Sequence, residues 1–270
     1  MGLAIDSVGF TRTGGAGGDT VPLASTVAAG DSFTVRAGAA GSLIHLEDIF
    51  FAGGLEDVVR VRSPLLHDNV SGLQFTVGES PATRLMPSRY PQTLQSQDTL
   101  TLEQLVAVAA AVDVGVLSIY YENLGGSQAR LKMPSDVAAL ISAIKPVKVV
   151  LPAGGAASVW LDALITTTEN LLDANTDYAV LGYEVDDPTC AVGIKGADTG
   201  NLRVVGPGVL TADDTVEYFV KRSEVTGRPH IPIINSANSN NTYVSAFDLA
   251  SPTGTVVTLV LARLSSPLGA

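Results

Sequence analysis

Segments of the first half of this 270-residue chain return, in the same order, in its second half. Each match is short, but the shared order indicates one unit that is present twice. The number of residues between a segment and its match in the second half increases once, after the first pair of matched segments. We therefore expect the second copy to carry an insertion between Ala157 and Arg228. A chain of this length can bury two separate cores. The matched segments are Val35–Gly41 with Leu151–Ala157, Arg84–Pro87 with Arg228–Pro232, Ser96–Thr99 with Ser239–Thr242, and Val116–Leu124 with Val256–Leu264.

Both copies are predicted to be rich in β-strands. Short runs of β-branched and aromatic residues alternate with turns that contain glycine, proline or aspartate. A parallel α/β fold would need more helices than the sequence offers. The pattern therefore favours an all-β fold of antiparallel sandwiches or barrels with a few short helices. The expected strands are Ser32–Arg36, Leu43–Phe51, Asp57–Val61, Leu73–Val77, Val114–Tyr121, Val147–Leu151, Val159–Leu164, Tyr178–Val185, Ala191–Lys195, Leu202–Val205, Val216–Arg222, Ile231–Ile234, Tyr243–Phe247 and Val256–Leu264.

Two helices are predicted between these strands. Thr101 and Gln104 have the spacing of a capping box, and the Ala-rich segment Leu105–Val112 favours a helix behind it. A second helix is predicted to start at Ser135 as N-cap and to end before Pro146, because proline cannot continue a helix. Glu169–Ala174 is expected to add a helical turn.

These patterns predict four parts in the chain. Residues 1–29 are expected to be a flexible N-terminal arm, because ordering a segment with Gly14-Gly15-Ala16-Gly17-Gly18 at its centre costs much backbone entropy. Residues 30–124 are the first β unit, 125–146 a helical linker, and 147–270 the second β unit.

Composition and charge restrict the possible partners. The net charge is −11 and no basic arm or stripe is present, which argues against direct contact with nucleic acid. Charged residues make up only 16% of the chain, which suggests that neighbouring subunits cover much of its surface. The first residues lack the pattern of a signal peptide. The most apolar stretch, Leu105–Tyr121, is too short for a membrane span and contains Asp113.

Histidine and cysteine do not suggest a metal site. His45, His67 and His230 are far apart, without companions at metal-ligand spacing. His45 alternates with Ile44 and Leu46, which predicts an outward or hydrogen-bonded strand residue. The single cysteine, Cys190, is expected to be a small buried side chain.

Three further motifs have a chemical and a structural interpretation. Gly193–Gly200 resembles a phosphate loop in composition, but the lysine precedes the turn, so a hairpin is favoured. Asp186-Asp187 and Asp213-Asp214 could bind calcium, although turn formation explains them better. The Asn-rich segment Ser236–Thr242 could bind a sugar, but the favoured interpretation is a surface loop that is the counterpart of the polar loop Gln95–Thr99. The sequence thus predicts no catalytic residue, no bound cofactor and no metal ligand.

The repeated segments, together with a helix at Thr101–Val112 before the strand Val114–Tyr121, give the chain a resemblance to a known family. It resembles the double jelly-roll major capsid proteins of tailless icosahedral, often membrane-containing, bacterial or archaeal viruses. The resemblance extends from about Gly30 to Ser265. It departs from the family in the second unit, where Asp248–Gly254 is a short connector instead of a helix.

This resemblance implies two tandem antiparallel β-sandwiches of jelly-roll type. It further implies a homotrimer of pseudo-hexameric outline that contacts neighbouring capsomers in the icosahedral capsid of a virion, such as a bacteriophage, after synthesis in the host cytoplasm. Minor capsid or vertex proteins would be further partners, and the N-terminal arm would face an internal membrane.

Two other functions remain open at this stage. A phage decoration or fibre protein, or a carbohydrate-binding module, would also be a non-enzymatic β-sandwich. An enzyme would require a hidden carboxylate pair such as Glu47 with Asp57. The expectation from the sequence is that the protein is not an enzyme.

Overall fold

The computed structural model describes residues 2–13, 20–22, 24–25, 30–53, 58–65, 72–76, 82–85, 92–105, 112–126, 129–166, 172–208 and 215–269. Within these ranges every strand pair is antiparallel, and the strands form four sheets. The all-β fold class expected from the sequence is confirmed.

The first unit contains sheets 1 and 2. Sheet 1 has the order β2-β10-β6-β7, with β4 paired to β10, and sheet 2 has the order β3-β1-β11-β5-β8, with β9 paired to β5. Their strands are β1 (Ala4–Thr13), β2 (Thr20–Pro22), β3 (Ala24–Ser25), β4 (Phe33–Thr34), β5 (Ile44–Ala52), β6 (Val58–Arg62), β7 (Leu73–Thr76), β8 (Ala82–Leu85), β9 (Gln92–Leu94), β10 (Thr99–Leu105) and β11 (Val112–Tyr121).

The second unit contains sheets 3 and 4. Sheet 3 has the order β14-β19-β16-β17, and sheet 4 has the order β12-β18-β15-β20-β13. Their strands are β12 (Leu131–Lys132), β13 (Ile141–Val150), β14 (Leu161–Leu164), β15 (Asp177–Val185), β16 (Ala191–Lys195), β17 (Arg203–Pro207), β18 (Ile231–Asn235), β19 (Tyr243–Phe247) and β20 (Val256–Leu264). The helical segments are α1 (Pro134–Val137), η1 (Ala138–Leu140), α3 (Tyr218–Thr226) and η2 (Ser236–Asn241).

The two units have the same topology. The order β1-β11-β5-β8 in sheet 2 matches β13-β20-β15-β18 in sheet 4, strand for strand in chain order. The order β2-β10-β6-β7 in sheet 1 matches β14-β19-β16-β17 in sheet 3. Eight strands in two four-stranded sheets, with the first strand beside the last, form a jelly roll. The chain is therefore two jelly rolls in tandem.

This topology tests the repeated segments. Val116–Leu124 and Val256–Leu264 do match, because each contains much of the last strand of its unit, and Ser96–Thr99 and Ser239–Thr242 both lead into the strand before it. The first match is wrong: Val35–Gly41 lies between β4 and β5, whereas Leu151–Ala157 lies between β13 and β14.

The extra residues of the second unit have a definite place. Strand β7 begins at residue 73 and its counterpart β17 at 203, whereas β8 begins at 82 and β18 at 231. The second unit is thus longer between β17 and β18, and helix α3 occupies this segment.

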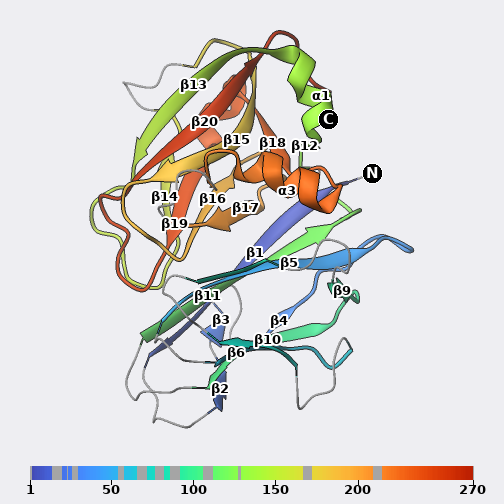
Figure 1. Cartoon of the computed structure of the whole chain (residues 1–270), viewed down its shortest axis with the longest axis vertical. Helices are drawn as coiled ribbons and strands as arrows, with labels where there is room; N and C mark the ends of the chain where they lie inside the picture. The colour runs from blue at the N-terminus through green and yellow to red at the C-terminus, as the bar shows by residue number, and fades with distance from the viewer. Residues whose placement is uncertain are drawn as a thin grey trace.

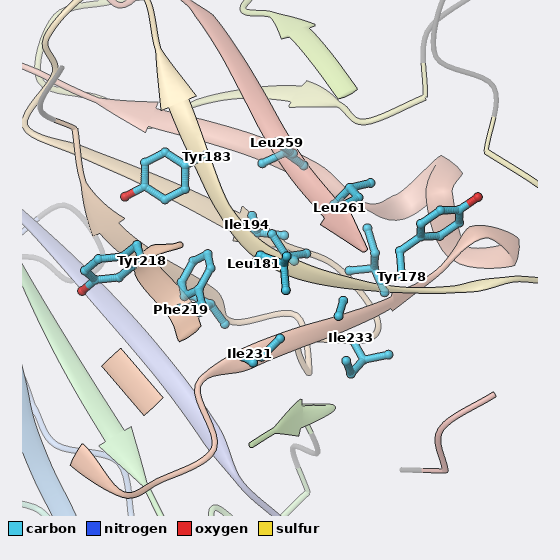
Figure 2. Packing of buried hydrophobic residues seen from close by; sticks show 14 of the residues in the cluster. Tyr178, Leu181, Tyr183, Ile194, Tyr218, Phe219, Ile231, Ile233, Leu259 and Leu261 are labelled. Atoms are coloured by element: carbon cyan, nitrogen blue, oxygen red, sulfur yellow. The ribbon is translucent and has the colours of Figure 1, made fainter. Parts of the chain in front are cut away.

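The four sheets are stacked as layers, with the second jelly roll above the first in Figure 1. Side chains from sheets 1 and 2 form one core, which includes Phe10, Leu46, Val61 and Leu102. Side chains from sheets 3 and 4 and from α3 form most of the other core, which Ile5 and Tyr120 of sheet 2 also join. In that core Tyr183, Tyr218 and Phe219 lie together at one end, beside Ile231 of β18 (Figure 2).

The expected N-terminal arm is wrong for residues 4–13. Strand β1 pairs along its whole length with β11, from Ala4 beside Tyr121 to Thr13 beside Val112. Its side chains Ala4, Val8 and Phe10 are buried in the first core, and their burial outweighs the entropy cost of ordering the segment. These residues cannot be an arm that reaches a membrane.

The predicted helix at Thr101–Val112 is also wrong where the structure describes it. Thr99–Leu105 is strand β10, which pairs with β6 on one side and with β2 and β4 on the other. Leu100 and Leu102 fill the first core, so tertiary packing overrides the local capping pattern. Residues 106–111 lie outside the described residues.

Two expectations, one for the second unit and one for the linker, need correction. The segment Val216–Arg222 was expected to be a strand, but Tyr218–Thr226 is helix α3, which ends at Gly227 with a left-handed φ of 68°. The predicted linker helix is short: α1 starts after the N-cap Met133 instead of Ser135, and Asp136 accepts a hydrogen bond from the Met133 amide at 2.9 Å.

The expected linker also ends earlier than residue 146. Ile141–Val150 is the edge strand β13, paired with β20. Pro146 is tolerated there because an edge strand does not need every backbone N–H. The segment Glu169–Ala174, expected to add a helical turn, lies mostly outside the described residues.

Candidate functional site

The face between the two jelly rolls carries the largest buried group of charged side chains in the described residues. Sheet 2 supplies Glu47 and Asp48 from β5, and the second unit supplies Arg222, Arg228 and His230. We call these five residues the inter-roll cluster. Their side chains are 3–5% exposed, apart from Arg228 at 17%.

A β-bulge in β5 places both carboxylates on the same face. Ser118 of β11 lies opposite Asp48, while the next residue, Ile119, lies opposite Leu46, so Glu47 is the extra residue. Neighbouring side chains of a regular strand point to opposite faces. The bulge breaks this alternation, and both acids therefore face the second jelly roll.

Glu47 accepts hydrogen bonds from three side chains of the second unit. Its Oε1 lies 2.7 Å from Arg228 Nη1, and its Oε2 lies 3.1 Å from His230 Nε2 and 3.3 Å from Arg222 Nη2. The Arg222 Nη2 atom also donates to the Glu47 backbone carbonyl at 2.8 Å. Burial alone would raise the pKa of Glu47, but His230 and the two guanidinium groups outweigh burial and lower this pKa to about 2.

Asp48 is in a different electrostatic environment. Its Oδ2 accepts a hydrogen bond from the Tyr218 hydroxyl at 3.0 Å, and Arg222 Nη2 lies 2.8 Å from its Oδ1. Burial raises the pKa of Asp48 to about 6, and the neighbouring charge of Glu47 adds to this rise, against the attraction of Arg222. Two adjacent carboxylates thus have pKa values shifted in opposite directions.

Aromatic rings border this cluster. The His230 ring stacks on Tyr120 of β11 with a centroid distance of 5.2 Å, and the Arg228 guanidinium lies 5.7 Å from the same ring. Burial raises the pKa of the Tyr120 hydroxyl. His45 is buried beside Tyr120, and its Nε2 lies 3.4 Å from Glu122 Oε1; burial lowers its pKa, and Arg228 lowers it further. Of the two alternatives expected from the sequence, His45 is thus the hydrogen-bonded strand residue, and it is buried.

Chemically, a glutamate hydrogen-bonded to a histidine is able to move a proton. A substrate would have to reach the pair, and the buried side chains of Glu47 and His230 leave it no room. The charges instead compensate one another across the contact, so the cluster fixes the orientation of the two jelly rolls.

Apolar packing continues the contact beyond the cluster. Phe50, Ala52, Val114 and Val116 of sheet 2 pack against Cys190, Ala191, Val205 and Phe247 of the second unit. Burial raises the pKa of the Cys190 thiol well above its ordinary value, so this cysteine is an unreactive apolar side chain, as the sequence indicated.

A second charged network anchors the segment between the jelly rolls. Arg130 contacts Asp177 at 2.5 Å and Asp198 at 3.3 Å, and it also donates to the carbonyl of Leu268. The Asn235 amide donates to Asp177 at 2.7 Å, and the Asn238 amide to Asp198 at 3.1 Å. Of these two residues, Asn238 belongs to the segment Ser236–Thr242, and its amide serves the internal network instead of a sugar.

The remaining candidates have structural roles or lie elsewhere. Gly193–Gly200 includes the end of β16 and the hairpin turn to β17, as expected. Asp186 caps a strand, because its Oδ1 accepts the Val256 amide at 2.7 Å. His67, Asp57, Asp213 and Asp214 lie outside the described residues. Among the residues that the structure describes, no three or more His, Cys, Asp or Glu side chains are placed to hold a metal ion.

Sequence reasoning missed most of the inter-roll cluster. It considered Glu47 and His230 separately, and it did not consider Asp48, Arg222 or Arg228 as site residues. One signal was present: Glu47 and Asp48 interrupt a strand that is apolar apart from His45. A pair of adjacent acids in a buried strand indicates a bulge and basic partners, but it does not identify those partners.

Comparison with known proteins gives few results. No family model matches the chain, and no curated protein matches it. Among solved structures it is similar to the STIV MCP, with 10% identity and a TM-score of 0.22, over 95% of this chain and 96% of that chain. It is also similar to the major capsid protein P2 from Bacteriophage PM2, with 8% identity and a TM-score of 0.23, over 97% of both chains. These TM-scores are too low to establish a common fold, so the jelly-roll assignment rests on the strand order. No helix in the described part of the chain is long and apolar enough to cross a membrane.

Proposed function

We propose that this protein is a structural shell protein, the major capsid protein of an icosahedral virus. The observation that carries the proposal is the tandem pair of jelly rolls with identical strand order. Three chains of this kind bring together six units of one topology, which suits a pseudo-hexameric trimer. Such a trimer can tile a surface through six similar sides.

The inter-roll cluster supports this role. A tile must keep its two halves in one orientation. Apolar side chains fill the contact between sheets 2 and 3, and paired charges join sheet 2 to α3 and to the segment that follows it. The low content of charged residues, 16%, also suits a protein whose flanks contact neighbours. Self-association is therefore the main interaction that we propose, with location in the virion after synthesis in the host cytoplasm.

Minor capsid or vertex proteins are the further partners in this proposal. We do not propose that residues 4–13 contact an internal membrane, because they form strand β1 within sheet 2.

A carbohydrate-binding module is the alternative that experiment must separate from a capsid protein. Such modules stack sugars on exposed aromatic rings, and none of the aromatic side chains in the described ranges is exposed. Trp160, the single tryptophan, is partly buried against Phe247 at 5.1 Å, under the Arg203 guanidinium at 4.2 Å.

Light scattering after size-exclusion chromatography, followed by electron microscopy, tests the proposal. A mass of three chains and particles of hexagonal outline, or closed shells, are the expected results. A stable monomer that binds a glycan array would overturn the capsid proposal and favour the carbohydrate-binding module.

A further inference from the structure

Residues 265–269 follow β20 and return to the connection between the two jelly rolls, where they meet Arg130. We call these five residues the strap. All of them are exposed except Leu268, which is partly buried and packs against the core of the second jelly roll. One apolar side chain is therefore the main anchor of the strap.

Two buried charged side chains hold the backbone of Leu268. Its N–H donates a hydrogen bond to Asp177 Oδ2 at 2.9 Å, and its carbonyl oxygen accepts one from Arg130 Nη2. Arg130 and Asp177 also pair with each other at 2.5 Å, and their side chains are 14% and 0% exposed. Both backbone groups of one residue are thus bound by a single ion pair, while the leucine side chain packs beside it. Main-chain hydrogen bonds together with a side-chain contact are the way in which proteins recognise an extended peptide.

The second jelly roll positions this ion pair through further contacts. The backbone N–H of Arg130 donates to the Asp198 carbonyl at 2.8 Å, and the backbone carbonyl of Arg130 accepts from the Ile233 amide at 2.8 Å. Asp177 accepts a hydrogen bond from the Asn235 side-chain amide at 2.7 Å. The strap therefore binds to a site that other segments have already built.

The first part of the strap is loosely packed. The Ser265 amide donates to the Leu140 carbonyl at 2.8 Å, but Ser266 and Pro267 border a hollow of about 290 Å³. An exposed segment with few apolar contacts opens at a small cost in free energy, so we expect the strap to detach while the jelly roll stays folded. Pro267 restricts the detached chain, which lowers the entropy cost of binding again.

We infer that the strap is a detachable peptide ligand of the Arg130–Asp177 pair, bound within its own chain, and that its release loosens the connection between the two jelly rolls. The site takes an extended peptide with a leucine, whose main chain meets the two charges. Occupancy of the site and order of the connection are linked, because Arg130 belongs to both. This inference goes beyond the capsid proposal and does not depend on it.

Binding of a separate peptide tests the inference. Leu268→Asp in the full chain places a second carboxylate beside Asp177 and should release the strap. The peptide Ser-Ser-Pro-Leu-Gly, added to this variant, should then show saturation transfer to its leucine methyl groups by NMR. The wild type should show at least about fivefold less transfer, because its own strap competes at an effective concentration on the order of millimolar. The same peptide with aspartate in place of leucine should show no transfer with either protein.

Hydrogen exchange tests the effect on the connection. In L268D the amides within residues 129–133 and 265–269 should exchange about tenfold faster than in the wild type, while those of β16 should not change. S266D adds the same charge at an exposed position of the strap and should behave like the wild type in both experiments. L268A removes the anchor without adding charge and should shift both results in the same direction as L268D.

Three results would overturn the inference. The first is no saturation transfer with either L268D or L268A, or equal transfer with the wild type. The second is faster exchange of the strap without faster exchange of residues 129–133. The third is faster exchange throughout the chain, which would make Leu268 a fixed part of the core. None of these measurements depends on how many chains associate, so a failure here leaves the capsid proposal standing, and a monomeric protein would overturn only the capsid proposal.

Discussion

The Nε2 atom of His230 lies 3.1 Å from Oε2 of Glu47, although the two residues are 183 positions apart and belong to different jelly rolls. The bulge in β5 makes this contact possible, because it turns Glu47 toward the second unit together with Asp48. The relative orientation of the jelly rolls thus depends on a few buried charges.

Replacing Glu47 with Gln is expected to destabilise the protein by about 3 kcal/mol, because Arg222 and Arg228 would lose their compensating charge in a buried site. Chemical denaturation followed by fluorescence measures this loss. The control E224Q removes an exposed acid and should change the free energy of unfolding by less than about 0.5 kcal/mol. A loss for E47Q as small as that of the control would contradict a stabilising role for the cluster.

Glu47 also predicts a loss of stability in acid. Its folded-state pKa of about 2 lies below the ordinary value of 4.5, so its contribution is complete above about pH 4.5. That contribution is lost as the pH falls through 2. The free energy of unfolding, measured from pH 6 to pH 2, should fall less steeply for E47Q than for the wild type. Parallel curves for the two proteins would argue against a lowered pKa of Glu47.

Asp48 is expected to give the opposite dependence of stability on pH. Its pKa is raised from 3.8 to about 6, so the stability that its neutral form contributes is complete below about pH 3.8 and is lost as the pH rises through 6. Asp48→Asn keeps an acceptor for the Tyr218 hydroxyl and stays neutral. Between pH 4 and pH 7 the variant should gain on the order of 2–3 kcal/mol relative to the wild type. A constant difference across this range would show that Asp48 titrates normally.

Gly182 of β15 is predicted to tolerate no side chain. A Cβ at this position would lie 2.1 Å from the Thr215 carbonyl oxygen and 2.4 Å from that of Val216, which precede α3. Gly182→Ala should therefore cost about 2 kcal/mol or more through overpacking, measured by thermal or chemical denaturation. Gly125→Ala is the matched control, because a Cβ there meets open space. Equal stability of both variants would mean that α3 does not pack so closely.

Cys190 reports on the contact between sheets 2 and 3. The native thiol should react with a thiol reagent at least about 100-fold more slowly than an exposed cysteine, because burial raises its pKa and blocks access. Val159→Cys in a Cys190→Ala background supplies the exposed reference, since Val159 is 52% exposed. Fast labelling of native Cys190 would indicate that the two jelly rolls separate readily.

Much of the fold followed from sequence patterns. Ala191–Lys195, Tyr243–Phe247 and Val256–Leu264 are strands with the predicted bounds, because alternating or continuous β-branched residues between turns leave few other solutions. The patterns failed where local preference and tertiary packing disagree, as at Thr101–Leu105, where a helical capping pattern forms a strand. At Tyr218–Thr226 a β-prone composition forms a helix, and the C-capping Gly227 was the local signal for it.

The sequence by itself determined the all-β class and the tandem arrangement of two units, since both depend on composition, turn residues and strand periodicity along the chain. Only the tertiary structure decided that Ala4–Thr13 completes the first jelly roll, and that Glu47 meets Arg222 and His230. The physical reason is the same in both cases. Strand order and bulge geometry bring together residues that are more than 100 positions apart, and the chemistry of one segment carries no record of its distant partner.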